Sequence, residues 1–238
     1  NGSTSNTLRS GIVLVNGSSG TTIGGTTAGA RNVLSGNNHF GFEVLAGSQN
    51  NLLQGNYIGT DATGLVALGN INGGAVFWGA GTGNVFGGGA AGARNVIAGN
   101  TYNGASPGTG TTGTVIQGNY IGVGADGVTV LANGSVGVSV EGGSTGTLVG
   151  TNLDGSNDVA ERNIIAGSGT SGVVIDGAAT TGTLLRGNWI GLDSTGTAAA
   201  GNAVKGIYAL NSTGLLIGGT SAAERNVGVP SLRSTDYI

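Results

Sequence analysis

An asparagine followed two residues later by an aliphatic side chain recurs from end to end of the sequence, and this repeat constrains the fold more than any other feature. It appears first as Asn32-Val33-Leu34 and returns at intervals of 24 to 44 residues, with glycine replacing the aliphatic residue in the last copy. Such persistence indicates a chain built by stacking copies of one unit. The repeated asparagines are Asn32, Asn56, Asn95, Asn119, Asn163, Asn188 and Asn226.

Hydrophobic runs that begin with glycine set the length of the unit. Short runs of Val, Ile, Thr and Tyr bounded by Gly, Asn and Ser favour strands and turns, and helix-forming residues do not cluster at helical spacing. Each step of 30 to 35 residues has room for three short strands, of which the asparagine triplet is the third. We therefore predict an all-β protein: a single-stranded, right-handed parallel β-helix (β-solenoid) of about seven coils of three strands. The runs start at Gly11, Gly41, Gly74, Gly104, Gly137, Gly172 and Gly206.

Two kinds of coil alternate along the sequence. Odd coils lengthen the turn before the third strand, as in GGTTAGA ahead of Arg31, whereas even coils lengthen the turn after it, as in TDATGLVALGN after Gly59. We predict a single domain over residues 1–238, with edge segments at 1–10 and 228–238. Neither edge segment contains an amphipathic cap, so we expect that the chain was cut from a longer solenoid or that its open ends stack on neighbours.

The asparagine triplet also predicts an internal ladder. Side chains alternate between the two faces of a strand, so Asn32 and Leu34 point inward while Val33 points outward. Stacked coils lie roughly 4.8 Å apart, which brings successive asparagines within reach of one another. Each side-chain amide can then donate to the side-chain carbonyl of the next coil. We assign these asparagines a structural role.

Composition excludes several classes of protein. The chain has 53 glycines among 238 residues, 8% charged residues, a net charge of -3 and a mean hydropathy of +0.17, which is too apolar for a typical disordered segment. It has no cysteine, so it contains neither disulfides nor a thiolate metal site. No apolar run is long enough to span a membrane. The arginines are scattered along the sequence, and we expect no nucleic-acid partner.

The repeated motifs resemble a known family. The stretch Ile23 to Asn37 reads IGGTTAGARNVLSGN and Gly55 to Gly64 reads GNYIGTDATG. These are similar to the IGGTxAxxRNVISGN and GNYIGTDATG repeats of bacterial secreted and surface right-handed parallel β-helix proteins. The resemblance implies an extracellular or cell-surface location and a non-catalytic structural or adhesive role. Echoes occur at Arg94 to Asn100, Gly118 to Gly122, Arg162 to Gly167, Gly187 to Gly196 and Ile217 to Asn226.

Apolar side chains recur at the outward positions of the predicted strands. A monomer rarely exposes a large contiguous apolar patch, so either the long turns cover these side chains or at least one face packs on another copy. We favour a self-assembling homo-oligomer, a filament or surface-layer or fibre subunit, with cell-surface glycans as a further candidate partner. The predicted contact residues are Leu52, Tyr57, Trp78, Val85, Val115, Tyr120, Leu148, Leu184, Trp189 and Leu216.

The alternative function is that of a polysaccharide-binding or polysaccharide-cleaving β-helix, since the wider class includes pectate lyases and polygalacturonases. Glu141 in GVSVE and Asp176 in GVVID hold the same strand position on successive coils, near the separation of about 5 Å that a retaining glycosidase needs. No Arg, Lys or His cluster accompanies them, and the motifs of polygalacturonases are absent. We therefore expect no catalytic residue, and we expect His39, the sole histidine, to lie in a solvated turn.

Calcium is the one cofactor that the sequence leaves open. Asp154 and Asp158 lie in the segment Asp-Gly-Ser-Asn-Asp, and the segments that begin at Asp61 and Asp193 are similar. Carboxylate and carbonyl oxygens are calcium ligands, but Asp and Gly are also ordinary turn formers. We expect no resident metal, with a weak calcium site as the alternative.

Overall fold

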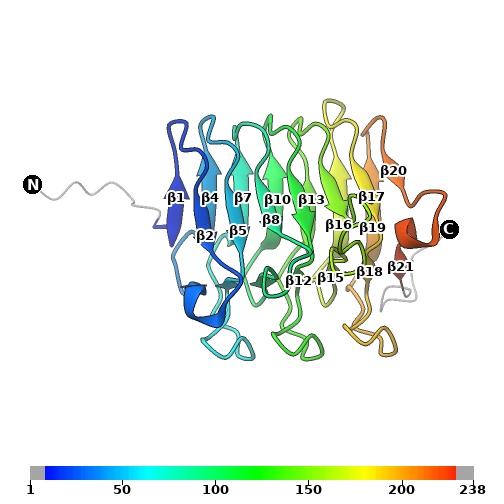
Figure 1. Ribbon diagram of the computed structural model, residues 1–238. Coiled ribbons are helices and arrows are strands. Elements are labelled where there is room, and N and C mark those ends of the chain that lie inside the picture. The colour runs from blue at the N-terminus through cyan, green and yellow to red at the C-terminus, as the bar shows by residue number, and fades with distance from the viewer. Residues whose placement is uncertain (1–8, 229–238) are drawn as a thin grey trace, which may run out of the picture.

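Three parallel sheets of seven strands each wind around one core in the computed structural model, which describes residues 9–228 (Figure 1). The first sheet takes one strand from every coil, in chain order. Its strands are β1 (Ile12–Leu14), β4 (Phe40–Leu45), β7 (Gly73–Trp78), β10 (Asn103–Gly108), β13 (Val138–Val140), β16 (Ser171–Asp176) and β19 (Lys205–Leu210).

The second and third sheets repeat this order, so the predicted β-solenoid of about seven coils is confirmed. The second sheet contains β2 (Thr22–Gly24), β5 (Leu52–Gln54), β8 (Val85–Gly87), β11 (Val115–Gln117), β14 (Leu148–Gly150), β17 (Leu184–Arg186) and β20 (Leu216–Ile217). The third contains β3 (Val33–Leu34), β6 (Tyr57–Ile58), β9 (Val96–Ile97), β12 (Tyr120–Ile121), β15 (Ile164–Ile165), β18 (Trp189–Ile190) and β21 (Val227–Gly228). Single 3₁₀ turns precede the first and last strands of the third sheet, at Ala28–Ala30 and Ala222–Glu224.

The core consists of the inward side chains of all three sheets. Equivalent side chains of successive coils stack on one another. For example, β9, β12 and β15 supply Ile97, Ile121 and Ile165, each 0% exposed. Near the N-terminal end the stack is aromatic, and the rings of Phe77 and Phe86 lie 4.2 Å apart edge to face. Burial of these side chains supplies the main stabilisation, because residues 9–228 form strands and two short 3₁₀ turns with no large helix to cover them.

The predicted asparagine ladder is present inside the coil, directly before the strands of the third sheet. The Nδ2 of Asn32 donates to Oδ1 of Asn56 at 2.9 Å, and the same bond repeats at every step as far as Asn226, with lengths from 2.9 to 3.2 Å. The five inner members are fully buried. Because every amide after Asn32 also donates to a backbone carbonyl, as Asn95 does to Leu53, the ladder pairs polar groups that water cannot reach.

A second ladder, which the sequence reasoning missed, lies where each coil turns toward the next strand of the first sheet. Its side-chain bonds measure 2.7 to 3.0 Å. The signal that could have revealed it is a Gly-Asn pair that precedes four of the glycine-led runs, with its asparagines at Asn37, Asn70, Asn100 and Asn202. A serine replaces one asparagine of this second ladder, whose members are Asn37, Asn70, Asn100, Asn133, Ser168 and Asn202.

The predicted extent of the single domain, residues 1–238, stays a prediction at both ends of the chain. Residues 1–8 and 229–238, which make up most of the two predicted edge segments, lie outside the described residues. Gly228 itself pairs with Ile190 as part of β21. Between residues 9 and 228, no helix has the length and apolar character needed to cross a membrane.

Candidate functional site

The outer face of the third sheet lies between two rows of turns. One row consists of the small hairpins that follow β6, β12 and β18, closed by antiparallel bridges such as Thr60 to Ala67, and these loops project from one side of the coil (Figure 1). Backbone hydrogen bonds join neighbouring hairpins, from Ala125 N to the Gly64 carbonyl and from Ser194 N to the Gly127 carbonyl, both 2.9 Å. The other row consists of the lengthened turns that precede β3, β9 and β15.

Arginines that are far apart in the sequence form a line along this face. The guanidinium of Arg31 lies 4.0 Å from the ring centroid of Tyr57, on the next coil, and its Nε donates to the Gly55 carbonyl at 3.2 Å. The arrangement repeats every second coil, with Arg94 over Tyr120 at 4.0 Å and Arg162 over Trp189 at 4.3 Å. The description of the arginines as scattered was therefore wrong in space, because the two-coil period of the sequence aligns them.

Glycines of the hairpins also pack closely against these rings. A Cβ on Gly127 would lie 2.8 Å from Cε2 of Tyr120, and Gly127 has a φ of +71°, a conformation that favours glycine. Gly64 and Gly196 occupy the same place beside Tyr57 and Trp189. Each ring thus contacts both a hairpin glycine and an arginine.

Only some of the predicted contact residues on this face are available to a partner. Tyr57 and Tyr120 are each 8% exposed. These two rings therefore fit the first of the two predicted alternatives, in which turns cover the outward apolar side chains. Trp189 is half-buried, whereas Trp78, on the outer face of the first sheet, is 42% exposed.

The outer edges of the three guanidinium groups have no protein partner within residues 9–228. The ion pairs in that range are His39 with Glu43 and Arg186 with Glu224. The aligned arginines use Nε for a backbone carbonyl and leave both terminal nitrogens unpaired. Burial lowers the pKa of Arg162 from its ordinary value, yet a guanidinium remains protonated in proteins.

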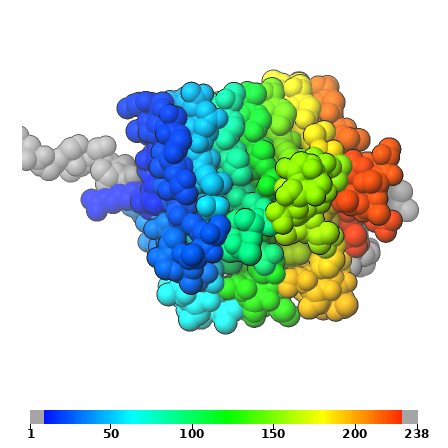
Figure 2. All heavy atoms as spheres, in the orientation of Figure 1, coloured from blue at the N-terminus to red at the C-terminus, as the bar shows by residue number. Residues whose placement is uncertain are grey.

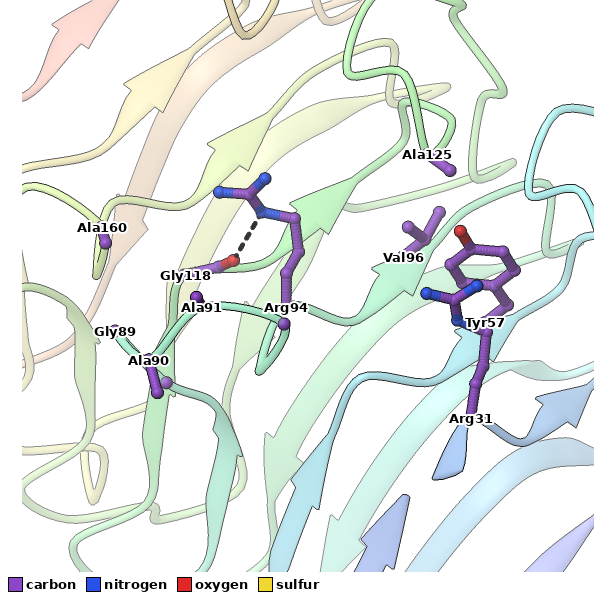
Figure 3. Close-up of a pocket in the computed structure, with 12 residues that line it drawn as sticks. Arg31, Tyr57, Gly89, Ala90, Ala91, Arg94, Val96, Gly118, Ala125 and Ala160 are labelled. Carbon is purple, nitrogen blue, oxygen red and sulfur yellow. Dashed lines mark hydrogen bonds between the residues drawn. The ribbon is translucent and has the colours of Figure 1, made fainter. Parts of the chain in front are cut away.

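Two hollows lie between the arginines. One, of about 290 Å³, is lined by Arg31, Tyr57 and Arg94 together with the turn Gly88 to Gly92 (Figure 3). The next, of about 100 Å³, lies between Arg94 and Arg162. Arg94 lines both, so the hollows are neighbours along the row of arginines, and we call this row with its two hollows the arginine channel. Its donors are suited to carboxylate, sulfate or phosphate groups.

Glu141 and Asp176 lie on a different face, at the end of the first sheet. The register of Val140 with Ile175 places them on adjacent coils, as the sequence predicted, and both are half-buried. Within the described part of the chain neither carboxylate accepts a hydrogen bond or pairs with a base. The structure therefore brings the two acids together without bringing any third chemical group to them.

His39 is not in a solvated turn, which corrects the sequence prediction. It is 9% exposed, with Nδ1 2.8 Å from Oε1 of Glu43 and 3.2 Å from Oγ of Ser10. Ser10 also hydrogen bonds to Glu43. In a catalytic triad the serine and the acid contact opposite ring nitrogens, whereas here they share one. The cluster therefore ties the first coil to the second and does not form a nucleophile.

The predicted calcium ligands are engaged in turns. Oδ1 of Asp154 accepts from Ser156 N at 2.8 Å, and Oδ1 of Asp158 accepts from Gly155 N at 3.3 Å. No group of three or more His, Asp or Glu side chains that could hold a metal ion occurs in the described residues. Calcium binding at these turns stays a prediction.

Comparison of the chain with protein families, with curated proteins and with solved structures finds no match. The resemblance to β-helix surface repeats stays a prediction.

Proposed function

We propose that the protein is a non-catalytic structural or adhesive β-helix rod, extracellular or on a cell surface, that self-associates into a homo-oligomer or filament. The observation that carries this proposal is an aliphatic file along the outer face of the second sheet. The register joins its members from coil to coil, and all of them are half-buried or exposed. The file consists of Leu52, Val85, Val115, Leu148, Leu184 and Leu216.

This file differs from the outer file of the third sheet. There the aromatic side chains lie beneath arginines and hairpins, whereas Leu216 on the second sheet is 44% exposed. A contiguous apolar stripe on a flat sheet favours association, because joining two stripes removes both from water. A second copy presents the same stripe, so side-by-side packing of two rods is self-complementary. The extracellular or surface location is proposed from the family resemblance alone.

Sedimentation velocity over a range of protein concentrations, together with electron microscopy, tests the proposal. We expect a concentration-dependent oligomer or fibre that the double change Val115→Lys and Leu148→Lys disperses. The matched control is Val128→Lys, on a hairpin of the third sheet, which is already 49% exposed and should assemble like the wild type. A wild-type protein that stays monomeric at high concentration would refute the proposal.

A second candidate function is polysaccharide cleavage at Glu141 and Asp176, favoured by their placement on adjacent coils. Turnover of an acidic polysaccharide that disappears in Glu141→Gln would support it. Equal activity in that variant, or no turnover by the wild type, would leave the non-catalytic role.

A further inference from the structure

We propose that the arginine channel binds a linear acidic polysaccharide, with the carboxylates of the polymer on Arg31, Arg94 and Arg162. This site lies on the third sheet, away from the aliphatic file and from Glu141 and Asp176, so it is independent of the self-association proposed above.

The first argument is the constant pitch of the cations. Each arginine is two coils from the next, a distance of about 10 Å for strands roughly 4.8 Å apart. The row therefore runs along the axis of the rod and presents charge at regular intervals over about 20 Å. A regular row of charges is complementary to a polymer whose anionic groups also repeat regularly.

The second argument is charge. The chain carries a net charge of -3, yet the residues that line the two hollows include three arginines and no Asp or Glu. A cationic strip on an acidic protein attracts a polyanion to this face and not to the rest of the surface.

The third argument is preorganisation. The bond of 3.1 Å from Nε to the Gly118 carbonyl, drawn in Figure 3, holds the Arg94 guanidinium at one end. Stacking on Tyr120 then fixes the plane of the guanidinium. The terminal nitrogens then present a fork for a carboxylate, and the side chain loses little further entropy on binding. The same two restraints act on Arg31 and Arg162.

The shape of the channel favours a polysaccharide over other polyanions. Single-stranded nucleic acids bind by stacking bases on exposed rings, but Tyr57 and Tyr120 are each 8% exposed and lie beneath an arginine. The channel crosses the strands, so a peptide lying in it cannot extend the sheet. Its floor and walls include the small residues Gly88 to Gly92, which expose backbone polar groups that can bind hydroxyls. Figure 2 shows the lengthened turn before β15, in yellow-green, standing out from the face toward the viewer.

Affinity electrophoresis and calorimetry with polygalacturonate test the proposal. We expect the wild type to bind, with weaker binding at higher salt, and we expect Arg94→Gln to weaken binding about tenfold because Arg94 lines both hollows. Arg94→Lys should recover only part of the affinity, since it restores charge without the planar fork. Lys205→Gln is the matched control, because it removes one cation that contacts Tyr208 on the first sheet. Thermal unfolding verifies that each variant is folded.

A length series of galacturonate oligomers adds a geometric readout. Affinity should rise when an oligomer becomes long enough to span two arginines, about 10 Å, and again at about 20 Å for three. No binding of polygalacturonate by the wild type, equal binding by folded Arg94→Gln, or equal loss in Lys205→Gln would overturn the proposal. So would equally tight binding of oligothymidylate or polyglutamate, which would indicate a general attraction of polyanions. Neutral dextran should not bind.

Discussion

The guanidinium of Arg94 lies 4.0 Å from the ring centroid of Tyr120, which belongs to the following coil. The contact joins two coils on the outside of the rod, as the asparagine ladder joins them on the inside. Arg94 and Tyr120 are 26 positions apart in the sequence, and they meet because they lie on adjacent coils. The contact both stabilises the stack of coils and orients a cation toward the channel.

Removing the ring should lower stability. Tyr120→Leu keeps apolar bulk but loses the cation–π contact and part of the packing, so we expect the free energy of unfolding to fall by about 1–2 kcal/mol. Urea unfolding followed by circular dichroism measures this. Tyr102→Leu, at a site 55% exposed, should change stability little. Equal losses in the two variants would show that the ring stack is not the cause.

The close approach of Gly127 to the same ring makes a separate prediction. Gly127→Ala should destabilise the protein by about 1–3 kcal/mol more than Gly110→Ala. Both glycines have a φ of +71°, so both changes incur the same backbone strain, but a Cβ at Gly110 meets nothing within 4 Å. A Cβ at Gly127 would also meet Oγ and Cβ of Ser194, so the difference in unfolding midpoint measures the close packing of Gly127 against both Ser194 and Tyr120. Matching midpoints would refute the close packing.

Loss of one inner ladder member should be costly. Asn119→Ala removes the Oδ1 that accepts from both Nδ2 and the backbone N–H of Asn95, and it removes the amide that donates to Oδ1 of Asn163. Buried hydrogen bonds are lost on both sides, and the backbone N–H of Asn95 loses its acceptor. We expect a loss of about 3 kcal/mol, since each unsatisfied buried group costs about 1–3 kcal/mol. Asn226→Ala, at the end of the ladder, disturbs one neighbour and should cost less. Denaturant titration of both variants checks the order, and the reverse order would contradict it.

Low pH should destabilise the row of hairpins that follows β6, β12 and β18. The hydroxyl of Thr63, and then the backbone N–H groups of Val66 and Leu65, hold the pKa of Asp61 below its ordinary value of 3.8. Hydrogen bonds from Thr129 and Thr195 likewise lower the pKa of Asp126 and Asp193. A carboxyl with a lowered pKa in the folded state stabilises the fold above its ordinary pKa and loses that contribution as the pH falls through the lowered value.

The combined change Asp61→Asn, Asp126→Asn and Asp193→Asn should therefore flatten the fall in stability below pH 3.8. Melting temperatures of the variant and the wild type, measured from neutral to acid pH, provide the comparison. An unchanged acid slope would show that these carboxylates do not stabilise the loops.

The sequence predicts the first asparagine ladder, but it misses the second ladder and the contacts that join the two kinds of coil. The inward asparagine and aliphatic residue recur at one place in each unit, so periodicity and the alternation of a strand suffice to predict the ladder from Asn32 to Asn226. Arg31 and Tyr57 instead belong to different kinds of coil, and their contact appears only when an odd coil stacks on an even one. His39 was misjudged for a similar reason, because its burial depends on Glu43 and on Ser10 from the preceding coil.

The gap in the second ladder offers a way to strengthen the fold. Ser168 replaces asparagine between Asn133 and Asn202, and its buried hydroxyl has no partner. Its backbone N already donates to Oδ1 of Asn202 at 3.0 Å, the bond that asparagines make elsewhere in this file. Gly137 faces Ser168 just as Gly104 faces Asn133, which leaves room for the larger side chain.

Ser168→Asn should therefore raise the free energy of unfolding by about 1 kcal/mol, because the new amide can accept from Asn133 and donate to Asn202. Chemical denaturation of the wild type and the variant measures the gain. Ser168→Ala controls for loss of the unpaired hydroxyl and should be nearly neutral. If both variants gain equally, the hydroxyl alone was unfavourable; if Ser168→Asn loses stability, the second ladder cannot extend across this coil.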